Sequence, residues 1–143
     1  MQANERNPIV LGFAPMDDVH AEFAAIIARA QACSDPDFPA CLAEVIAHLR
    51  AHFGAEDAWM RETDFPPGDC HVDEHAAVLK SADEVAPLVA QGRIDIGRSF
   101  VAELARWFPG HADYLDSALA AWMCKRRLGG KPVVLQRRPR SGG

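Results

Sequence analysis

Four stretches of the chain repeat apolar residues at steps of three and four, and short segments rich in proline and glycine separate them. This repeat follows the 3.6-residue turn of an α-helix and gives each helix one apolar face. Because no stretch alternates as a strand does, the sequence predicts an all-α protein, an up-down-up-down antiparallel four-helix bundle. The predicted helices run from Asp17 or Asp18 to about Cys33, from Pro39 to about Glu62, from about His71 to Gln91-Gly92, and from about Ile94 to Leu128.

The two ends of the chain lack this repeat. Residues 1–15 show no helical period, and Gly129, Gly130 and Pro132 are expected to stop the last helix. The chain of 143 residues, with 49% hydrophobic content, suffices for one domain with a real core. We therefore expect a single domain over residues 10–128, an N-terminal arm over residues 1–9 and a basic C-terminal tail over residues 129–143.

Charge and composition argue against several classes of protein. The formal net charge of -5 does not suit a protein that neutralises phosphates, so no nucleic-acid partner is expected. The sequence has no membrane-length apolar run and no secretory leader, which predicts a cytoplasmic protein without a membrane partner. The cysteines form no CxxC pair, so free thiols are expected rather than disulfides or a thiolate zinc site. These cysteines are Cys33, Cys41, Cys70 and Cys124.

Ionisable residues occur on or near all four apolar faces. Burying an unpaired charge costs several kcal/mol, so a bundle core has no ordinary use for such groups. Taken singly, each histidine fits an ordinary hydrogen-bonded residue, but together they indicate a metal-ligand set. The candidate metal ligands are His20 in the first helix, His52 and Glu56 in the second, His71 and His75 in the third, and His111 and Asp116 in the fourth.

The spacing within the second and third helices supports a metal site. Residues four apart on an α-helix point to nearly the same side, so His52 with Glu56 and His71 with His75 each face one cluster. Five histidines and two carboxylates exceed what one tetrahedral zinc ion requires, so two ions fit better. Imidazole with carboxylate suits iron, manganese, copper or zinc, and spacing alone leaves the metal open.

The fourth helix presents a difficulty. Five residues of regular helix turn through about 500°, which leaves His111 and Asp116 roughly 140° apart and puts Asp116 on the flank with Phe108 and Leu119. Proline removes a helical hydrogen bond, so Pro109-Gly110 could introduce a wide turn that rotates one ligand toward the other. We predict such a local distortion, which a regular helix through Asp116 would contradict.

The order of these motifs resembles that of the bacterial hemerythrins over about residues 10 to 125. A single histidine, HxxxE, HxxxH and HxxxxD in this order are far more specific together than any one of them alone. The matching segments are His20, His52-Phe-Gly-Ala-Glu56, Asp64-Phe-Pro-Pro, His71-Val-Asp-Glu-His75 and His111-Ala-Asp-Tyr-Leu-Asp116.

The resemblance implies a cofactor of two Fe ions, a di-iron centre bridged by an oxo or hydroxo group. His48 lies four residues before His52, but the family's His-Phe-x-x-Glu motif selects His52. The implied roles are terminal ligation of one iron by His71, His75 and His111, terminal ligation of the other by His20 and His52, and bridging by Glu56 and Asp116.

The resemblance further implies reversible binding of dioxygen, for storage, delivery or sensing, with dioxygen as the partner. Candidates for an apolar wall that excludes water are Phe23, Phe53, Trp107 and Leu115. Two alternatives stay open: an enzyme that acts on peroxide or nitric oxide, and a redox- or iron-sensing module. No obvious extra acid-base group accompanies the ligands, which favours a carrier. A ferritin-like site is rejected because it requires Glu-x-x-His on two helices.

Overall fold

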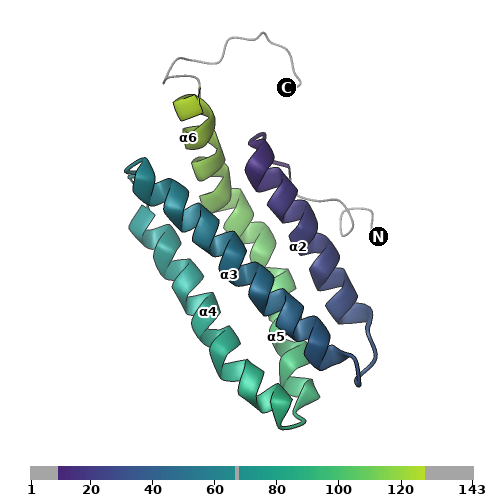
Figure 1. Ribbon diagram of the computed structural model, residues 1–143. Coiled ribbons are helices and arrows are strands. Elements are labelled where there is room, and N and C mark those ends of the chain that lie inside the picture. The colour runs from purple at the N-terminus through teal and green to yellow at the C-terminus, as the bar shows by residue number, and fades with distance from the viewer. Residues whose placement is uncertain (1–9, 67, 128–143) are drawn as a thin grey trace.

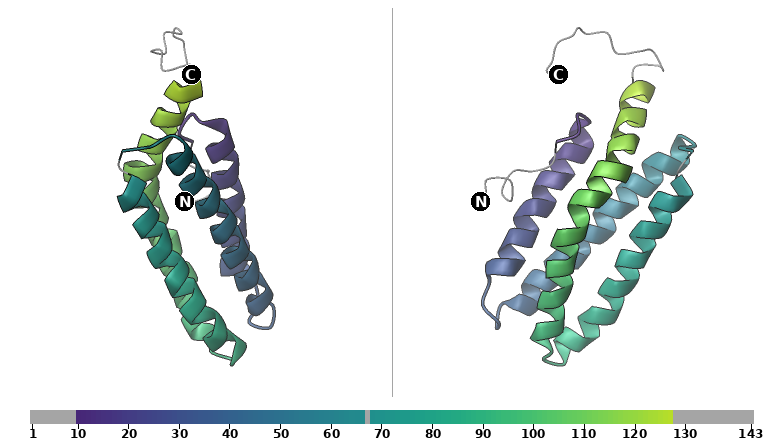
Figure 2. Two further views of the ribbon diagram at one scale, coloured as in Figure 1. Left: turned by 60° about the vertical axis from the view of Figure 1, so that its left-hand side comes forward. Right: turned by 180° about the vertical axis from the view of Figure 1, so that it is seen from behind.

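The computed structural model describes residues 10–66 and 68–127, and these form an antiparallel four-helix bundle (Figures 1 and 2). Helix α2 packs against α3 and α5, and α4 packs against the same two helices. The described residues contain no strand, so the predicted all-α bundle is confirmed. The elements are α2 (Ala14–Ala32), α3 (Phe38–Glu62), α4 (Gly68–Ala90), α5 (Ile94–His111), the π-helix η1 (Ala112–Asp116) and α6 (Ser117–Arg127).

Helix α2 begins earlier than the sequence predicted. Its N-cap is Phe13, and Pro15 occupies the first turn, where a missing backbone N–H costs nothing. The carboxylate of Asp17 accepts hydrogen bonds from the backbone N–H groups of Leu11 (2.7 Å) and Gly12 (3.0 Å). The predicted start of this helix at Asp17 or Asp18 was therefore wrong, and Asp17 instead anchors the segment before the helix.

The other helix boundaries agree with the sequence to within a few residues. Helix α3 ends at Glu62 as predicted, and α4 ends at Ala90, just before Gly92, whose φ of 99° suits glycine. The predicted end of the last helix at Leu128, the arm over residues 1–9 and the tail over residues 129–143 all lie outside the described residues.

Two apolar clusters fill the bundle, and a layer of polar residues lies between them. In α2, His20 falls between Met16 of the smaller cluster and Phe23 of the larger one. Glu56 falls between the two clusters in the same way along α3. The polar layer is thus enclosed on both sides by side chains whose burial stabilises the fold.

The apolar face of the fourth helical segment changes phase at η1. The three- and four-residue steps Phe100, Leu104, Trp107 and His111 predict that Leu115 and Ala118 face inward next. In the structure Leu115 is half-buried and Ala118 is exposed. Leu119 and Ala120 are buried in their place. A π-helical turn contains one residue more than an α-turn, so the face that points inward moves by one position after it. This part of the predicted stripe was wrong.

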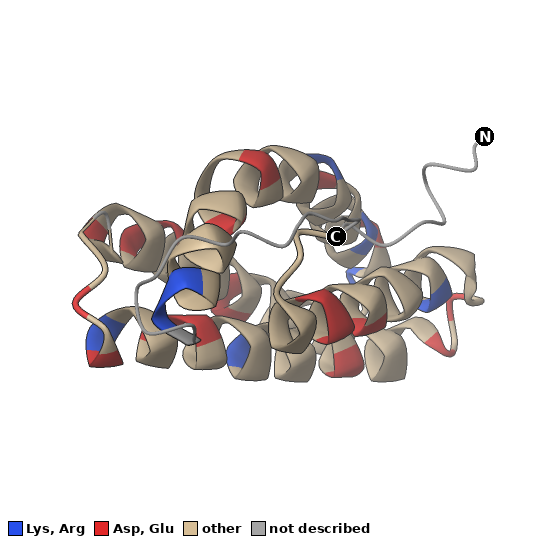
Figure 3. Cartoon of the chain, turned by 90° about the horizontal axis from the view of Figure 1, so that it is seen from above, with Lys and Arg blue, Asp and Glu red and all other residues tan. Residues whose placement is uncertain are grey.

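The surface carries charges of both signs. Acidic residues are spread over the helices, with lysines and arginines interspersed among them (Figure 3). Arg29 of α2 pairs with Glu44 of α3, and Arg98 of α5 pairs with Asp35 in the turn between α2 and α3, both at 2.8 Å. Such exposed pairs contribute little in water. None of the described helices combines the length and the hydropathy that a membrane span requires.

Candidate metal centre

All seven predicted ligand residues meet in the polar layer. Each side chain is buried, and none of the seven residues is more than 3% exposed. Their ligand atoms form two groups that share both carboxylates. The first group is Glu56, His71, His75, His111 and Asp116, and the second is His20, His52, Glu56 and Asp116.

In the first group, three imidazole nitrogens converge. The Nε2 atom of His111 lies 3.1 Å from Nε2 of His71 and 3.2 Å from Nε2 of His75. Asp116 Oδ1 lies 2.9 Å from His71 Nε2, and Glu56 Oε1 lies 3.2 Å from His75 Nε2. Three nitrogens that point at one spot, with an oxygen from each of two carboxylates, are the donor set of a cation site.

The second group uses the other oxygen of each carboxylate. Glu56 Oε2 lies 3.0 Å from His52 Nε2 and 3.7 Å from His20 Nε2, and Asp116 Oδ2 lies 3.1 Å from His20 Nε2. Each carboxylate therefore presents one oxygen to the three-histidine group and one to the two-histidine group. This is the disposition of a carboxylate that bridges two cations.

Several of these buried atoms lie close to an oppositely charged group but make no hydrogen bond of acceptable geometry with the described residues. They are His20 Nε2, Glu56 Oε1 and both carboxylate oxygens of Asp116. A buried polar atom without a partner costs roughly 1–3 kcal/mol, and more when it is charged. Four such atoms in one cluster are accounted for by cations between them, so the residues present fit a metal centre.

The electrostatics of the cluster favour positive charge between the two carboxylates. Burial lowers the pKa of His20, but its contacts with Asp116 and Glu56 outweigh burial and raise this pKa to about 9. The same balance raises the pKa of His71 to about 9. Burial raises the pKa of Glu56 and Asp116, and the surrounding histidines overcome this effect and lower both below the ordinary range. The two acids therefore remain carboxylates at neutral pH, as metal ligation requires.

The π-helix brings together His111 and Asp116, the two ligand residues that are five positions apart. The backbone N–H of Ser117 donates to the carbonyl of Ala112, five residues back, and His111 Nε2 lies 3.1 Å from Asp116 Oδ1. The wide turn starts at Ala112, three residues after Pro109, and the N–H of Ala112 still donates to the carbonyl of Phe108 as in an α-helix. The predicted distortion between His111 and Asp116 is therefore present, but it lies after Pro109-Gly110 and not at these two residues.

Aromatic rings surround the histidines. Phe53 stacks on His75 with ring centroids 4.0 Å apart, and Trp107 lies 4.3 Å from His111. Phe23 contacts His52 at 5.8 Å. These three contacts agree with the predicted wall, and the fourth candidate, Leu115, is half-buried.

The sequence interpretation missed Phe108, which it placed on the flank of the last helix. Phe108 is buried and lies 5.0 Å from the ring of His20 and 4.7 Å from the ring of Phe23. Its position three residues before His111 could have revealed it, because residues three apart share a helix face.

Two carboxylates outside the cluster were also missed. Asp57 Oδ1 lies 2.8 Å from Nδ1 of His75, and Glu74 Oε1 lies 2.7 Å from Nδ1 of His111. Each of these contacts joins two different helices. Spacing within one helix gives no signal for them.

His48 and Cys70 can also bind metals and lie close to ligand residues in the sequence. His48 lies one turn before His52 and is in neither ligand group, and its Nδ1 is 4.0 Å from a carboxylate oxygen of Glu22. Burial and the nearby His52 lower the pKa of His48. Cys70, which precedes His71, is an exposed thiol in neither ligand group, and the four cysteines are free as predicted.

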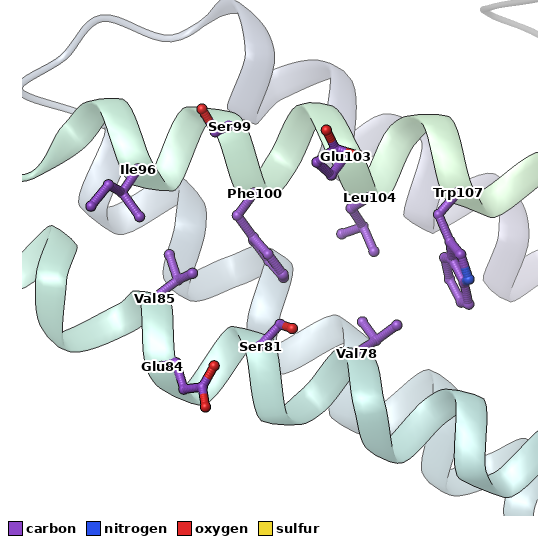
Figure 4. A pocket seen from close by; sticks show the side chains of 10 residues that line it. All are labelled: Val78, Ser81, Glu84, Val85, Ile96, Ser99, Phe100, Glu103, Leu104 and Trp107. Atoms are coloured by element: carbon purple, nitrogen blue, oxygen red, sulfur yellow. The ribbon is translucent and has the colours of Figure 1, made fainter.

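A hollow of about 390 Å³ lies between α4 and α5 (Figure 4). Val78 and Val85 of α4 face Phe100 and Leu104 of α5 across it, and Trp107 lies at one end. The metal-ligand candidates do not line this hollow, and Trp107 separates it from His111. The buried cluster and the hollow are therefore different features.

A four-helix bundle whose core holds histidines and carboxylates in two groups defines a class, the helical-bundle proteins that bind metal cations through their core. The chain belongs to the hemerythrin family, because the profile of the hemerythrin HHE cation binding domain matches residues 11–123. It is also similar to the bacteriohemerythrin of Ralstonia nicotianae, with 40% identity over 116 residues, 81% of this chain and 85% of the relative. No solved structure matches the chain significantly.

Proposed function

We propose that the buried cluster is a di-iron centre that binds dioxygen reversibly. The observation that carries this proposal is the sharing of Glu56 and Asp116, each of which presents one oxygen to each histidine group. Membership of the hemerythrin family and the similarity to a bacteriohemerythrin support it. In the proposed centre His71, His75 and His111 hold one iron, His20 and His52 hold the other, and Glu56 and Asp116 bridge the two.

Two ferrous ions supply the two electrons that reversible binding of dioxygen requires. The position held by His20 and His52 would have one imidazole ligand fewer than the position held by His71, His75 and His111. An external ligand would therefore bind at the position of His20 and His52. We therefore assign the oxygen-binding side to His20 and His52. Phe108, 5.0 Å from the ring of His20, and Phe23, 5.8 Å from that of His52, cover this side.

The aromatic residues around the cluster exclude water from the proposed site. Phe23, Phe53 and Phe108 belong to one buried apolar cluster, and their rings pack directly on three of the histidines. Exclusion of water disfavours loss of a charged product and so favours release of dioxygen over oxidation of the metal. This surrounding suits a carrier or sensor of dioxygen.

The test is the metal content and visible absorption of the anaerobically reduced protein, before oxygen is added, afterwards, and again after its removal. Two irons per chain and an absorption band that appears with oxygen and disappears without it would support the proposal. Iron that oxidises irreversibly, or steady consumption of peroxide with a reductant, would assign the centre to an enzyme instead. A protein that takes up no iron would refute the proposal.

A further inference from the structure

The five ligand histidines differ in what their outward-facing ring nitrogens contact. Each ring directs Nε2 toward the cluster, which leaves Nδ1 for a second partner. His75 and His111 have one: Asp57 at 2.8 Å and Glu74 at 2.7 Å. The Nδ1 atoms of the other three histidines are buried and have no hydrogen-bond partner among the described residues. These three are His20, His52 and His71.

The difference divides the two ligand groups. Both carboxylate-bonded histidines belong to the three-histidine group, whereas neither His20 nor His52, the histidines of the other group, has such a partner. The two proposed metal positions therefore differ in their surroundings as well as in their number of imidazoles.

A carboxylate that accepts the Nδ1 hydrogen of a ligating histidine has three effects. It fixes the tautomer with a free Nε2 lone pair and holds the ring in place, and it raises the basicity of Nε2. Loss of such a partner typically weakens metal binding by about 10- to 100-fold. His20 and His52 must fix their tautomer and orientation by packing alone.

Asp57 and Glu74 are accessible enough to remain charged in this role. Their side chains are 24% and 42% exposed, while the histidines that they contact are at most 1% exposed. Water solvates the carboxylates on one side, so their charge has only a modest desolvation cost. Their replacement by amides removes no buried volume and should leave the fold intact.

We propose that Asp57 and Glu74 are positioning residues that make the three-histidine position the tighter metal site, so that it fills before the two-histidine position. This inference rests on the proposed metal centre and adds an order of assembly to it. Metal occupancy would then proceed from a mononuclear form held by His71, His75 and His111 to the complete centre.

The test is an anaerobic titration of the metal-free full chain with Co²⁺, followed by calorimetry and by the visible absorption of the ion. We expect two binding steps, the first at least about tenfold tighter than the second. The variant His75→Asn should abolish or weaken the first step and His20→Asn the second, which assigns the steps to the two positions.

Asp57→Asn and Glu74→Gln should each weaken the first step by about tenfold and leave the second unchanged. Asp73→Asn is the matched control, because Asp73 is exposed on the same helix beside Glu74 and belongs to neither ligand group. It should change neither step. Thermal unfolding of the metal-free variants checks that the fold is retained, since a purely structural role would lower stability without a selective effect on the first step.

Two equal steps in the unaltered protein, or amide variants that affect both steps or neither, would overturn the order of assembly. Two bound Co²⁺ ions would still support the proposed centre in that case. A chain that binds no Co²⁺ would overturn both proposals at once.

Discussion

Five residues separate Asp116 from His111 along the chain, and yet His111 Nε2 lies 3.1 Å from Asp116 Oδ1. The relationship depends on η1, in which the backbone bonds from Ser117 to Ala112 span five residues. In a regular α-helix the two side chains would diverge by about 140°. The wider π-turn therefore compensates for the five-residue spacing and lets Asp116 take part in both ligand groups.

Deletion of Tyr114 should preserve the cluster. Tyr114 is 82% exposed, and its removal would turn η1 into a regular α-turn with His111 and the aspartate four residues apart, on one face. We expect Co²⁺ binding to be retained and the melting temperature to be unchanged or higher. Deletion of Arg106, which is also on the surface, should abolish binding because it rotates every later ligand by about 100°. Equal loss of binding in both deletions would contradict this account of the π-turn.

Gly97→Ala should destabilise the protein although alanine favours helices. A Cβ atom at Gly97 would lie 2.5 Å from Phe38 Cε2 and 2.6 Å from Val89 Cγ2, so the packing between helices would have to open. We expect a loss of about 1–3 kcal/mol in the free energy of unfolding, measured with denaturant. Gly54→Ala is the control, since open space surrounds that position in α3, and it should stabilise by up to about 1 kcal/mol. Similar effects of the two substitutions would rule out the close contact as the cause.

Phe108→Leu should accelerate irreversible oxidation of the reduced, iron-loaded protein. Phe108 covers the ring of His20, and a smaller side chain would admit water to the two-histidine side. We expect unchanged iron content and a faster loss of the oxygen-dependent absorption over repeated cycles of oxygenation. Phe38→Leu is the control for general destabilisation, because Phe38 is fully buried in the same core cluster and makes no ring contact with a ligand histidine. Equal oxidation rates in the two variants would remove the special role of Phe108.

The metal-free protein should lose stability as the pH rises from 6.5 to 9.5. Burial lowers the pKa of His20 and His71, but their contacts with Asp116 and Glu56 raise both from 6.5 to about 9. A raised pKa means that the stabilising contribution is complete below pH 6.5 and is lost as the pH passes through about 9. Thermal unfolding in the presence of a chelator should show a melting temperature lower by several degrees at the higher pH.

Two further measurements complete the pH experiment. His20→Asn should reduce the drop in melting temperature, because one of the two responsible groups is gone. The metal-loaded protein should not show the drop, since cations bind neutral imidazole and compete with protons. A melting temperature of the metal-free protein that rises between pH 6.5 and 9.5 would contradict the assigned ion pairs.

Local periodicity explains what the sequence by itself determined. Apolar steps of three and four predicted four helices with most of their boundaries, and the four-residue spacings predicted that His52 with Glu56 and His71 with His75 share a helix face. These features depend on residues within one or two turns of each other. The order of the motifs supplied the family, which the profile match confirmed.

Tertiary packing decided the rest. The inward direction of Asp116 depends on a π-turn that only the assembled helices reveal, and that turn buried Leu119 where the repeat had predicted Ala118. The contacts of Asp57 with His75 and of Glu74 with His111 join residues on different helices, 18 and 37 positions apart. The distance between such side chains is set by how the helices pack against one another, and no spacing along a single helix encodes it.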